Sequence, residues 1–410
     1  LSGVGVGGGS LVYANTLPVP KASFFEEGSW AGLRDWQAEL APHYATAKRM
    51  LGATRNPFLG RTDELLREIA AERGQADRFS PTDVAVYFGE PGVEVDDPFF
   101  GGEGPRRRGC ILCGGCMLGC RHGAKNTLDR NYLWLAERRG AVVLPETRVE
   151  AVRPDSARGQ GYVVEARPTF GLRRPLQAFT ADKVVLAGGV LGTVDLLAAM
   201  KGVPDGLPEL SDQVGRDVRT NSEALFGVTA PGTDLTRGVA IGSILHTDER
   251  SHLEPVRYPA GSGLYRIMVL PHAPGNTLPA RLLASVRYAL SHPRRALGAA
   301  FVRDFSKSSA ILLYMRSAEG KLSLVRGAFG LDSRVEDGEA PSASIPEATA
   351  LAEAFADKMG GFVQSLFTET LLGSPTTAHI LGGAVIGRTA AEGVIGPDHQ
   401  VHGYPGLYVC

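Results

Sequence analysis

The sequence predicts an α/β fold joined to a second, strand-rich α+β part. An apolar run over residues 183–187 ends at Gly188 and Gly189 and leads into a helical stretch over 193–200, which makes the strand, turn and helix of an α/β unit. Residues 224–367 hold strand candidates that are separated by loops and one amphipathic helix, without regular crossovers. A chain of 410 residues is long enough for two domains.

The other elements follow in chain order from residue spacing and helix-breaking residues. Apolar residues at helical spacing predict a helix over 63–73. A cap at Asn126 or Thr127 predicts a second helix, which ends at Gly140. Strand candidates cover residues 141–144, 149–152, 162–166, 178–181, 239–245, 265–270 and 310–315.

The composition excludes two classes of protein. The formal net charge is −1, so the chain lacks the basic footprint of a nucleic-acid-binding protein. No apolar run approaches the roughly 18 to 20 residues that span a bilayer, which excludes an integral membrane protein. Glycine supplies 52 residues without a collagen period, and it therefore serves turns and close approaches of the backbone.

The ends of the chain suggest a piece of a longer protein. The first residue is Leu1 rather than Met, and the chain stops at Cys410 directly after an apolar strand candidate. We expect both termini of the parent protein to be missing. We favour a cytoplasmic or membrane-peripheral location, while secretion stays open because a signal peptide would precede Leu1.

Two glycine-rich segments are candidates for binding a nucleotide. Gly7, Gly8 and Gly9 permit a main chain whose N–H groups approach a pyrophosphate or a flavin ring, where any Cβ would collide. A flexible glycine loop is the alternative interpretation. Gly188 and Gly189 follow an apolar strand at the edge where α/β sheets bind ligands, and an ordinary tight turn is the alternative there.

Four sequence segments occur in an order and at a spacing that extend over nearly the whole chain. They are residues 7–12 (GGGSLV), 123–128 (GAKNTL), 185–197 (VLAGGVLGTVDLL) and 379–383 (HILGG). Together they resemble the glucose-methanol-choline (GMC) family of flavin oxidoreductases, and more narrowly its cholesterol oxidase-like branch.

The resemblance implies FAD and two domains. A Rossmann-like FAD-binding domain, without its first βαβ unit, is expected over residues 1–20, 100–225 and 376–410. A substrate-binding domain on an antiparallel sheet, with a lid or helical insertions, is expected over residues 21–99 and 226–375. The residues expected to bind FAD are Gly7, Gly8, Gly9, Ser10, Leu11, Tyr13, Val149, Gly188 and Gly189.

The resemblance also implies two catalytic residues. Oxidation of a secondary alcohol requires that a hydride leaves the carbon for flavin N5 while a base takes the hydroxyl proton. His379 stands where the family has a histidine before Leu-Gly-Gly, although a histidine among apolar residues is by itself more often a core residue. Glu254 lies five residues before Pro-Ala-Gly, as in the sterol-oxidase branch, and an ion pair with Arg257 is its alternative role.

Four of the five cysteines form a compact motif. Cys110, Cys113, Cys116 and Cys120 have the C-x2-C-x2-C-x3-C spacing with which bacterial ferredoxins hold iron–sulfur clusters. Arg121 stands where a ferredoxin has proline. Two interpretations stay open, an iron–sulfur cluster and structural thiols or disulfides, while zinc would prefer two separated pairs.

Three hypotheses for the function remain. The first is oxidation by FAD of the 3-hydroxyl of a sterol or another bulky alcohol, with molecular oxygen as the acceptor. The second is a dehydrogenase that passes electrons through the cysteine motif to another acceptor, and the third is a fragment unable to hold FAD. Leu282, Val286 and Leu290 share one face of a predicted helix that either rests on a membrane surface or packs on its own core.

Overall fold

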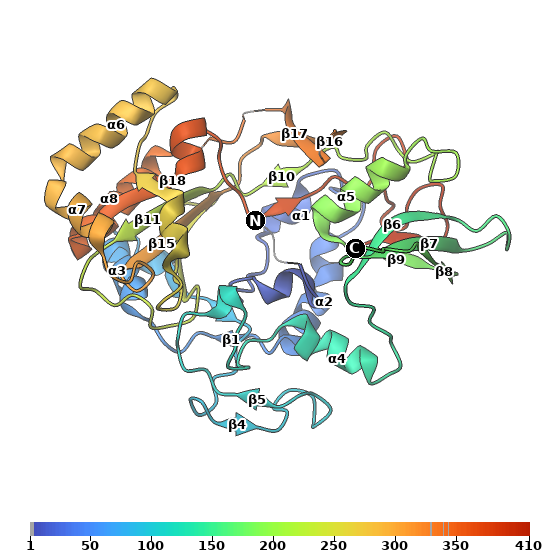
Figure 1. Cartoon of the computed structure of the whole chain (residues 1–410), viewed down its shortest axis with the longest axis horizontal. Coiled ribbons are helices and arrows are strands. Elements are labelled where there is room, and N and C mark those ends of the chain that lie inside the picture. Colours follow the sequence, from blue (N-terminus) through green and yellow to red (C-terminus); the bar gives the residue numbers. More distant parts are fainter. Residues whose placement is uncertain (1–3, 329, 339, 343) are drawn as a thin grey trace.

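The computed structural model describes residues 4–328, 330–338, 340–342 and 344–410. Leu1, Ser2 and Gly3, where we expect the truncated end of the chain, lie outside the described residues. Figure 1 shows two β-rich regions on opposite sides of the molecule, with the marked N- and C-terminal ends in the middle of the view.

A seven-stranded sheet forms one of these regions, on the left of Figure 1. Neighbouring strands in it pair antiparallel, which confirms the antiparallel sheet that the family resemblance implies. In spatial order its strands are β14 (Val269–Pro271), β18 (Phe362–Leu366), β11 (Ala224–Thr229), β15 (Ser309–Arg316), β13 (Ser251–Val256), β12 (Ser243–His246) and β2 (Phe79–Pro81).

Two helices cover one face of this sheet, α3 (Arg61–Glu72) and α8 (Pro346–Met359). Leu65 of α3 and Phe355 of α8 are fully buried in the core that they form with the sheet. Complete burial of such a side chain stabilises the fold by about 1.5–3 kcal/mol. The helix predicted over 63–73 is therefore confirmed, with its start two residues earlier.

The second region carries the predicted α/β unit, on the right of Figure 1. Strand β9 (Val184–Leu186) pairs in parallel with β20 (Leu407–Val409), and α5 (Gly189–Met200) follows the Gly188-Gly189 turn. Leu186, Leu197 and Leu407 share one buried core. The strand is confirmed, but an apolar run of this kind is typical of a buried strand, whereas Val185 is 59% exposed and β9 pairs only with β20 among the described residues.

The remaining elements connect or flank these regions. An antiparallel meander beside α5 consists of β6 (Thr147–Pro154), β7 (Tyr162–Pro168) and β8 (Gln177–Ala181), as predicted. The other elements are α1 (Ala22–Glu26), α2 (Trp36–Met50), β1 (Thr54–Arg55), β3 (Asp83–Val84), β4 (Glu94–Val95), β5 (Arg107–Arg108), α4 (Tyr132–Glu137), β10 (Arg219–Thr220), α6 (Leu278–Ser291), α7 (Pro293–Phe301), β16 (Lys321–Gly327), β17 (Gly330–Asp337) and β19 (Ile380–Leu381).

Three expected elements differ from the structure, one helix and two strands. The helix expected from Asn126 to Gly140 is wrong in its first turns: α4 begins at Tyr132, because the side chain of Asn126 is buried and accepts hydrogen bonds from Arg107 instead of capping a helix. The strand expected over 265–270 is a 3-10 helix up to Met268, and residues 141–144 form no strand.

Helix α6 carries its apolar face outward. Leu283 and Leu290 are 71% and 73% exposed, whereas Arg281 is buried and its Nε donates to the carbonyl of Thr370 at 2.8 Å. The interpretation that this apolar face packs on its own core is therefore wrong. Among the described residues, no helix combines the length and the hydropathy needed to cross a bilayer.

A buried ion pair anchors α3 beneath the sheet. Arg257 follows β13, and its Nη2 lies 2.6 Å from Oδ2 of Asp63, with both side chains fully buried. Asp63 also accepts from the backbone N–H of Gly60 and from the hydroxyl of Ser243. Because buried charges require such partners, this network commits Arg257 to a structural role.

Candidate active site

A short strand pair brings His379 to Glu223. Strand β10 pairs with β19 so that Thr220 stands opposite Ile380, which places the residue before β19 near the chain segment that follows β10. The Nδ1 of His379 lies 2.6 Å from Oε1 of Glu223. The hydroxyl of Thr377 donates to the same carboxylate oxygen at 2.9 Å and accepts from the N–H of His379 at 3.1 Å.

The Glu223 carboxylate shifts the pKa of His379. Its hydrogen bond raises the pKa of His379, and burial opposes that shift. Glu223 itself is buried, whereas the side chain of His379 is 49% exposed. The imidazole can therefore meet a ligand while its Nδ1 stays fixed.

A second carboxyl lies beside this pair. Glu369, in the helical turn Thr368–Leu372, is buried, and burial raises its pKa to about 8, with the charge of Glu223 adding to the shift. At neutral pH Glu369 is therefore mostly protonated.

Glu254 is buried in the middle of the sheet, in β13. Burial raises its pKa to about 7, and the nearby positive charge of His379 partly opposes the shift. The alternative ion pair with Arg257 is wrong, because the guanidinium of Arg257 is bound to Asp63 on the other face of the sheet. Among the described residues Glu254 has no ion-pair partner, and it lies within electrostatic reach of His379.

The surroundings of Glu254 are apolar. Side chains alternate along a strand, so Leu253 points to the α3 and α8 core and Glu254 to the opposite face with Val256. Leu313 and Met315 of β15 are buried on that same face. A carboxyl in such surroundings keeps a proton near neutral pH because the charged form is poorly solvated.

His252 is a further titratable group on this face, two residues before Glu254. Burial lowers its pKa to about 4, and the charges of His246, Lys21 and His379 add to the shift. His252 is therefore neutral at physiological pH.

The glycine segment and the cysteine loop pack against the face that carries Glu254. Ala14, next to Tyr13, and Met117, between the third and fourth cysteines, contact its buried cluster. The hydroxyl of Tyr13 donates to the carbonyl of Asn126 at 2.8 Å. Segments that are far apart in the sequence therefore converge on one side of the sheet.

The first glycine segment forms a tight, open turn. Gly7 and Gly8 have φ angles of 110° and 56°, and a 3-10 helix spans Gly8–Leu11. The hydroxyl of Ser10 donates to the carbonyl of Gly7 at 2.6 Å and accepts from the N–H of Leu128 at 2.9 Å. In the part of the chain that the structure describes, no atom outside the neighbouring residues lies within 4 Å of a Cβ placed on Gly8 or Gly9, so the backbone there is open.

The second glycine segment begins a helix. Gly188 caps α5, and Gly189 has a φ of 69° with open space where a Cβ would stand. Val149, the other expected FAD contact, lies in β6 at an irregularity of the β6–β7 pairing and is 40% exposed. The backbone at Gly188 and Gly189 is thus free to receive a group from outside.

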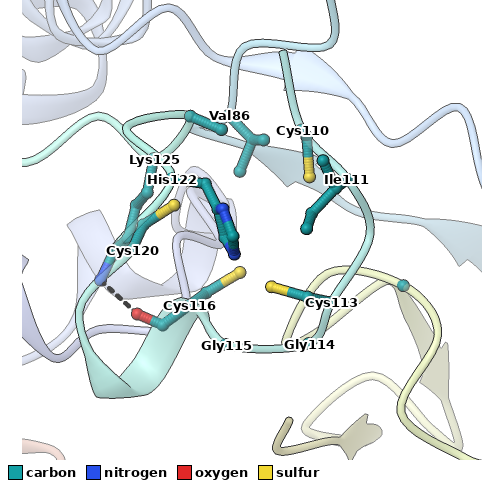
Figure 2. Close-up of a pocket in the computed structure, with 12 residues that line it drawn as sticks. Val86, Cys110, Ile111, Cys113, Gly114, Gly115, Cys116, Cys120, His122 and Lys125 are labelled. Carbon is teal, nitrogen blue, oxygen red and sulfur yellow. Dashed lines mark hydrogen bonds between the residues drawn. The ribbon is translucent and has the colours of Figure 1, made fainter. Parts of the chain in front are cut away.

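The four motif cysteines line one small cavity together with His122 and Lys125. Figure 2 shows their sulfur atoms pointing toward the space that the loop encloses. Among the described residues, no three His, Cys, Asp or Glu side chains are grouped so that they could hold a metal ion.

Comparison with known proteins decides the family. A family model described as GMC oxidoreductase matches residues 105–210. The chain is 42% identical over 427 residues to a cholesterol oxidase of Mycobacterium tuberculosis, an alignment that covers 100% of this chain and 73% of the relative. The chain belongs to the GMC oxidoreductase family. A cholesterol oxidase of Acinetobacter baumannii is 36% identical over 423 residues, covering 100% of this chain and 76% of that protein.

A solved structure shows the same fold. The formate oxidase of Aspergillus oryzae RIB40, described for its FAD modification, superimposes with a TM-score of 0.56 at 13% identity, covering 98% of this chain and 78% of the other. The GMC assignment makes the chain a flavin alcohol oxidoreductase with FAD as its cofactor, as the sequence resemblance predicted.

The residues of this GMC chain fit FAD. Polar atoms that are buried without a hydrogen-bond partner among the described residues lie beside both glycine segments: Oδ1 of Asp129 near Gly7, both side-chain atoms of Asn15, and Oγ1 of Thr193 in the first turn of α5. Buried polar atoms without partners are costly unless a ligand or water satisfies them. Open backbone next to unsatisfied polar atoms suits the phosphate and sugar groups of a dinucleotide.

Sequence reasoning missed Glu223 and Glu369. Neither belongs to a recognisable motif, and Glu223 is 156 positions from His379 along the chain. The one available signal was a carboxylate directly before the apolar strand β11, which by itself is weak.

Replacement of Glu223 tests the electrostatic coupling. Glu223→Gln removes the negative charge that favours the imidazolium, so we expect the pKa of His379 to fall. Titration of the imidazole NMR signals, assigned with His379→Asn, measures this pKa. Glu353→Gln, an exposed change on α8, should leave the pKa unaltered; the same titration curve in Glu223→Gln would refute the coupling.

Replacement of Glu254 tests its raised pKa without any assay of activity. The pKa of this carboxyl is about 7 in the folded chain and 4.5 ordinarily, so the folded state binds the proton more tightly and loses stability as pH rises from 4.5 to 7. In the unaltered chain the free energy of unfolding should fall between pH 5 and 8. In Glu254→Gln we expect that fall to be smaller, by on the order of 3 kcal/mol. Urea denaturation at both pH values measures it, with exposed Glu137→Gln as the control; an equal loss in Glu254→Gln would contradict the assignment.

Proposed function

We propose that this chain oxidises the secondary hydroxyl of a 3-hydroxysteroid or a similarly bulky lipid alcohol, with FAD as the hydride acceptor and molecular oxygen as the final acceptor. The observation that carries the proposal is the coupling of His379 to Glu254 across an apolar face of the sheet. Relatives 42% and 36% identical that are named cholesterol oxidases support the substrate class.

His379 is the proposed acceptor of the hydroxyl proton. The Glu223 carboxylate accepts from Nδ1–H, which leaves Nε2 as the ring nitrogen with a free lone pair. An alcohol that donates to Nε2 would be oriented and deprotonated by the same contact. FAD, when bound, supplies the chemistry that the protein lacks, by accepting the hydride from the alcohol carbon.

Glu254 is the proposed second proton-handling group. A carboxyl with a pKa of about 7 both accepts and releases protons near neutral pH. Its apolar neighbours Val256, Leu313 and Met315 suit the ring system of a steroid, because burial of apolar ligand surface is the main favourable contribution to binding there.

We also propose the domain division of the chain. The flavin domain comprises residues 1–20, 100–225 and 376–410, and the substrate domain comprises 21–99 and 226–375. Two separate cores support it: one formed by the sheet with α3 and α8, and another formed around β9, β20 and α5.

The FAD contacts are proposed from the two open glycine turns. In the first turn they are Gly7, Gly8, Gly9, Ser10, Leu11 and Tyr13, and in the second Gly188 and Gly189, with Val149 beside them in β6. The open backbone at Gly8, Gly9 and Gly189 supports this set.

Peripheral membrane contact through α6 is the remaining part of the proposal. Leu282, Leu283, Val286 and Leu290 form an exposed apolar stripe, and Arg287 on the same helix can meet anionic headgroups. A sterol is drawn from a membrane, so a surface helix of this kind would hold the enzyme near its substrate. No membrane-spanning segment is needed for such contact.

Replacement of His379 tests the proposed chemistry. His379→Asn removes the proton acceptor, so we expect turnover to fall by about 10²- to 10⁴-fold while the absorbance of bound FAD is unchanged. The measurement is peroxide release with a 3-hydroxysteroid. The exposed His43→Asn is the matched control, and normal turnover in His379→Asn would exclude the assigned role.

Replacement of two leucines tests the membrane contact. The double change Leu283→Glu and Leu290→Glu replaces exposed side chains, so the fold should be kept and binding to anionic vesicles should weaken by about tenfold or more. Co-sedimentation with sterol-containing vesicles measures it. Leu172→Glu, another fully exposed leucine, should bind like the unaltered chain; a chain that never binds vesicles would remove this part of the proposal.

A further inference from the structure

The four cysteines of the motif have no role in the proposed oxidation of the alcohol. Cys110, Cys113, Cys116 and Cys120 line one cavity, and the fifth cysteine, Cys410, is exposed at the end of β20. Cys116 is buried in a hydrophobic cluster, and the partly buried Cys110 and Cys120 pack against the same cluster.

The loop that carries the thiols is held by packing. Leu112, Gly114 and Gly119 have φ angles of 58°, 71° and 75°, which turn the chain repeatedly around the cavity. The N–H of Gly238 donates to the carbonyl of Leu112 at 2.9 Å, and the N–H of Gly114 donates to the carbonyl of Gly238 at 2.8 Å. All four thiols are free, so no cross-link is needed to bring them together.

Donors and a positive charge surround the sulfur atoms. The N–H of Leu112 lies 3.4 Å from Sγ of Cys110, and the N–H of Ala240 donates to Sγ of Cys116. The ammonium of Lys125 is buried beside the loop and donates to the carbonyls of Cys116 and Leu11, at 2.8 and 3.1 Å (Figure 2 draws the first). Such N–H···S bonds and a nearby cation are what thiolate ligands of an anionic cluster require.

A zinc site and an iron–sulfur cube require different arrangements of their cysteine ligands. Zinc would gather four ligands about one ion at about 2.3 Å, and among the described residues no three His, Cys, Asp or Glu are grouped for a metal ion. In an iron–sulfur cube the iron and sulfide atoms occupy the centre, so the four thiolates stand farther apart around a shared cavity. Four cysteines that line one cavity match the number of thiolate ligands of such a cube.

We propose that Cys110, Cys113, Cys116 and Cys120 hold one [4Fe–4S] cluster. In two-cluster ferredoxins with this spacing the fourth cysteine serves the other cluster, whereas here all four line one cavity and complete one set of ligands. The proposal concerns binding alone and does not depend on the alcohol that the enzyme oxidises.

The experiment is metal analysis of the full chain, purified without oxygen and reconstituted with ferrous iron and sulfide. We expect about four iron and four acid-labile sulfide per chain, with an EPR signal after reduction by dithionite. Stoichiometric zinc, disulfides within the quartet, or a folded chain with neither iron nor sulfide would overturn the proposal. FAD content is measured on the same sample, so loss of the cluster is distinguished from failure to bind the flavin.

Single substitutions localise the cluster. Cys116→Ser and, at a less buried position, Cys113→Ser should each lose most of the iron and sulfide, while Cys410→Ser should keep both. Circular dichroism and gel filtration show that the variants are folded, and Cys113→Ser keeps the test decisive if Cys116→Ser does not fold. Full iron and sulfide in folded Cys113→Ser would contradict ligation by this quartet.

Discussion

Burial of ionisable groups on one apolar sheet face is the constraint on which the site depends. Burial raises the pKa of Glu254 to about 7, and Arg257 does not counter this shift because its guanidinium is bound to Asp63 on the other face. The pKa of His379 is raised as well, but by a different cause, because Glu223 lies 2.6 Å from Nδ1 and favours the charged imidazolium. The two groups are thus poised to exchange protons near neutral pH without a permanent ion pair in the apolar region.

The architecture produces this arrangement by joining distant parts of the chain. The β10–β19 pairing brings His379 to Glu223. Glu254 lies in β13 of the seven-stranded sheet, within electrostatic reach of His379. Lys125 then connects the cysteine loop to the glycine segment, since its ammonium binds a carbonyl of each. Two candidate prosthetic-group sites and the proton-handling residues therefore share one structural neighbourhood.

Local pattern predicted part of this structure. Periodicity and helix-breaking residues predicted the helix over 63–73, the β6–β8 meander and the strand, turn and helix around Gly188. The family motifs suggested His379 and Glu254, whose roles stay proposals. The contact of Glu223 with His379 could not be predicted, because it joins residues 156 positions apart. Asn126 misled the helix prediction for the same reason: its side chain is used by Arg107, a tertiary contact with no local signal.

The central claim is that a bulky alcohol gives its hydride to FAD in this chain while His379 and Glu254 handle the proton. Anaerobic mixing of the FAD-loaded protein with a 3-hydroxysteroid, followed by flavin absorbance in a single turnover, tests it most directly. The account predicts that the steroid bleaches the flavin, that a short linear alcohol at the same concentration does so far more slowly, and that the rate rises with pH as His379 loses its proton. A flavin that the steroid leaves oxidised at every pH would contradict it.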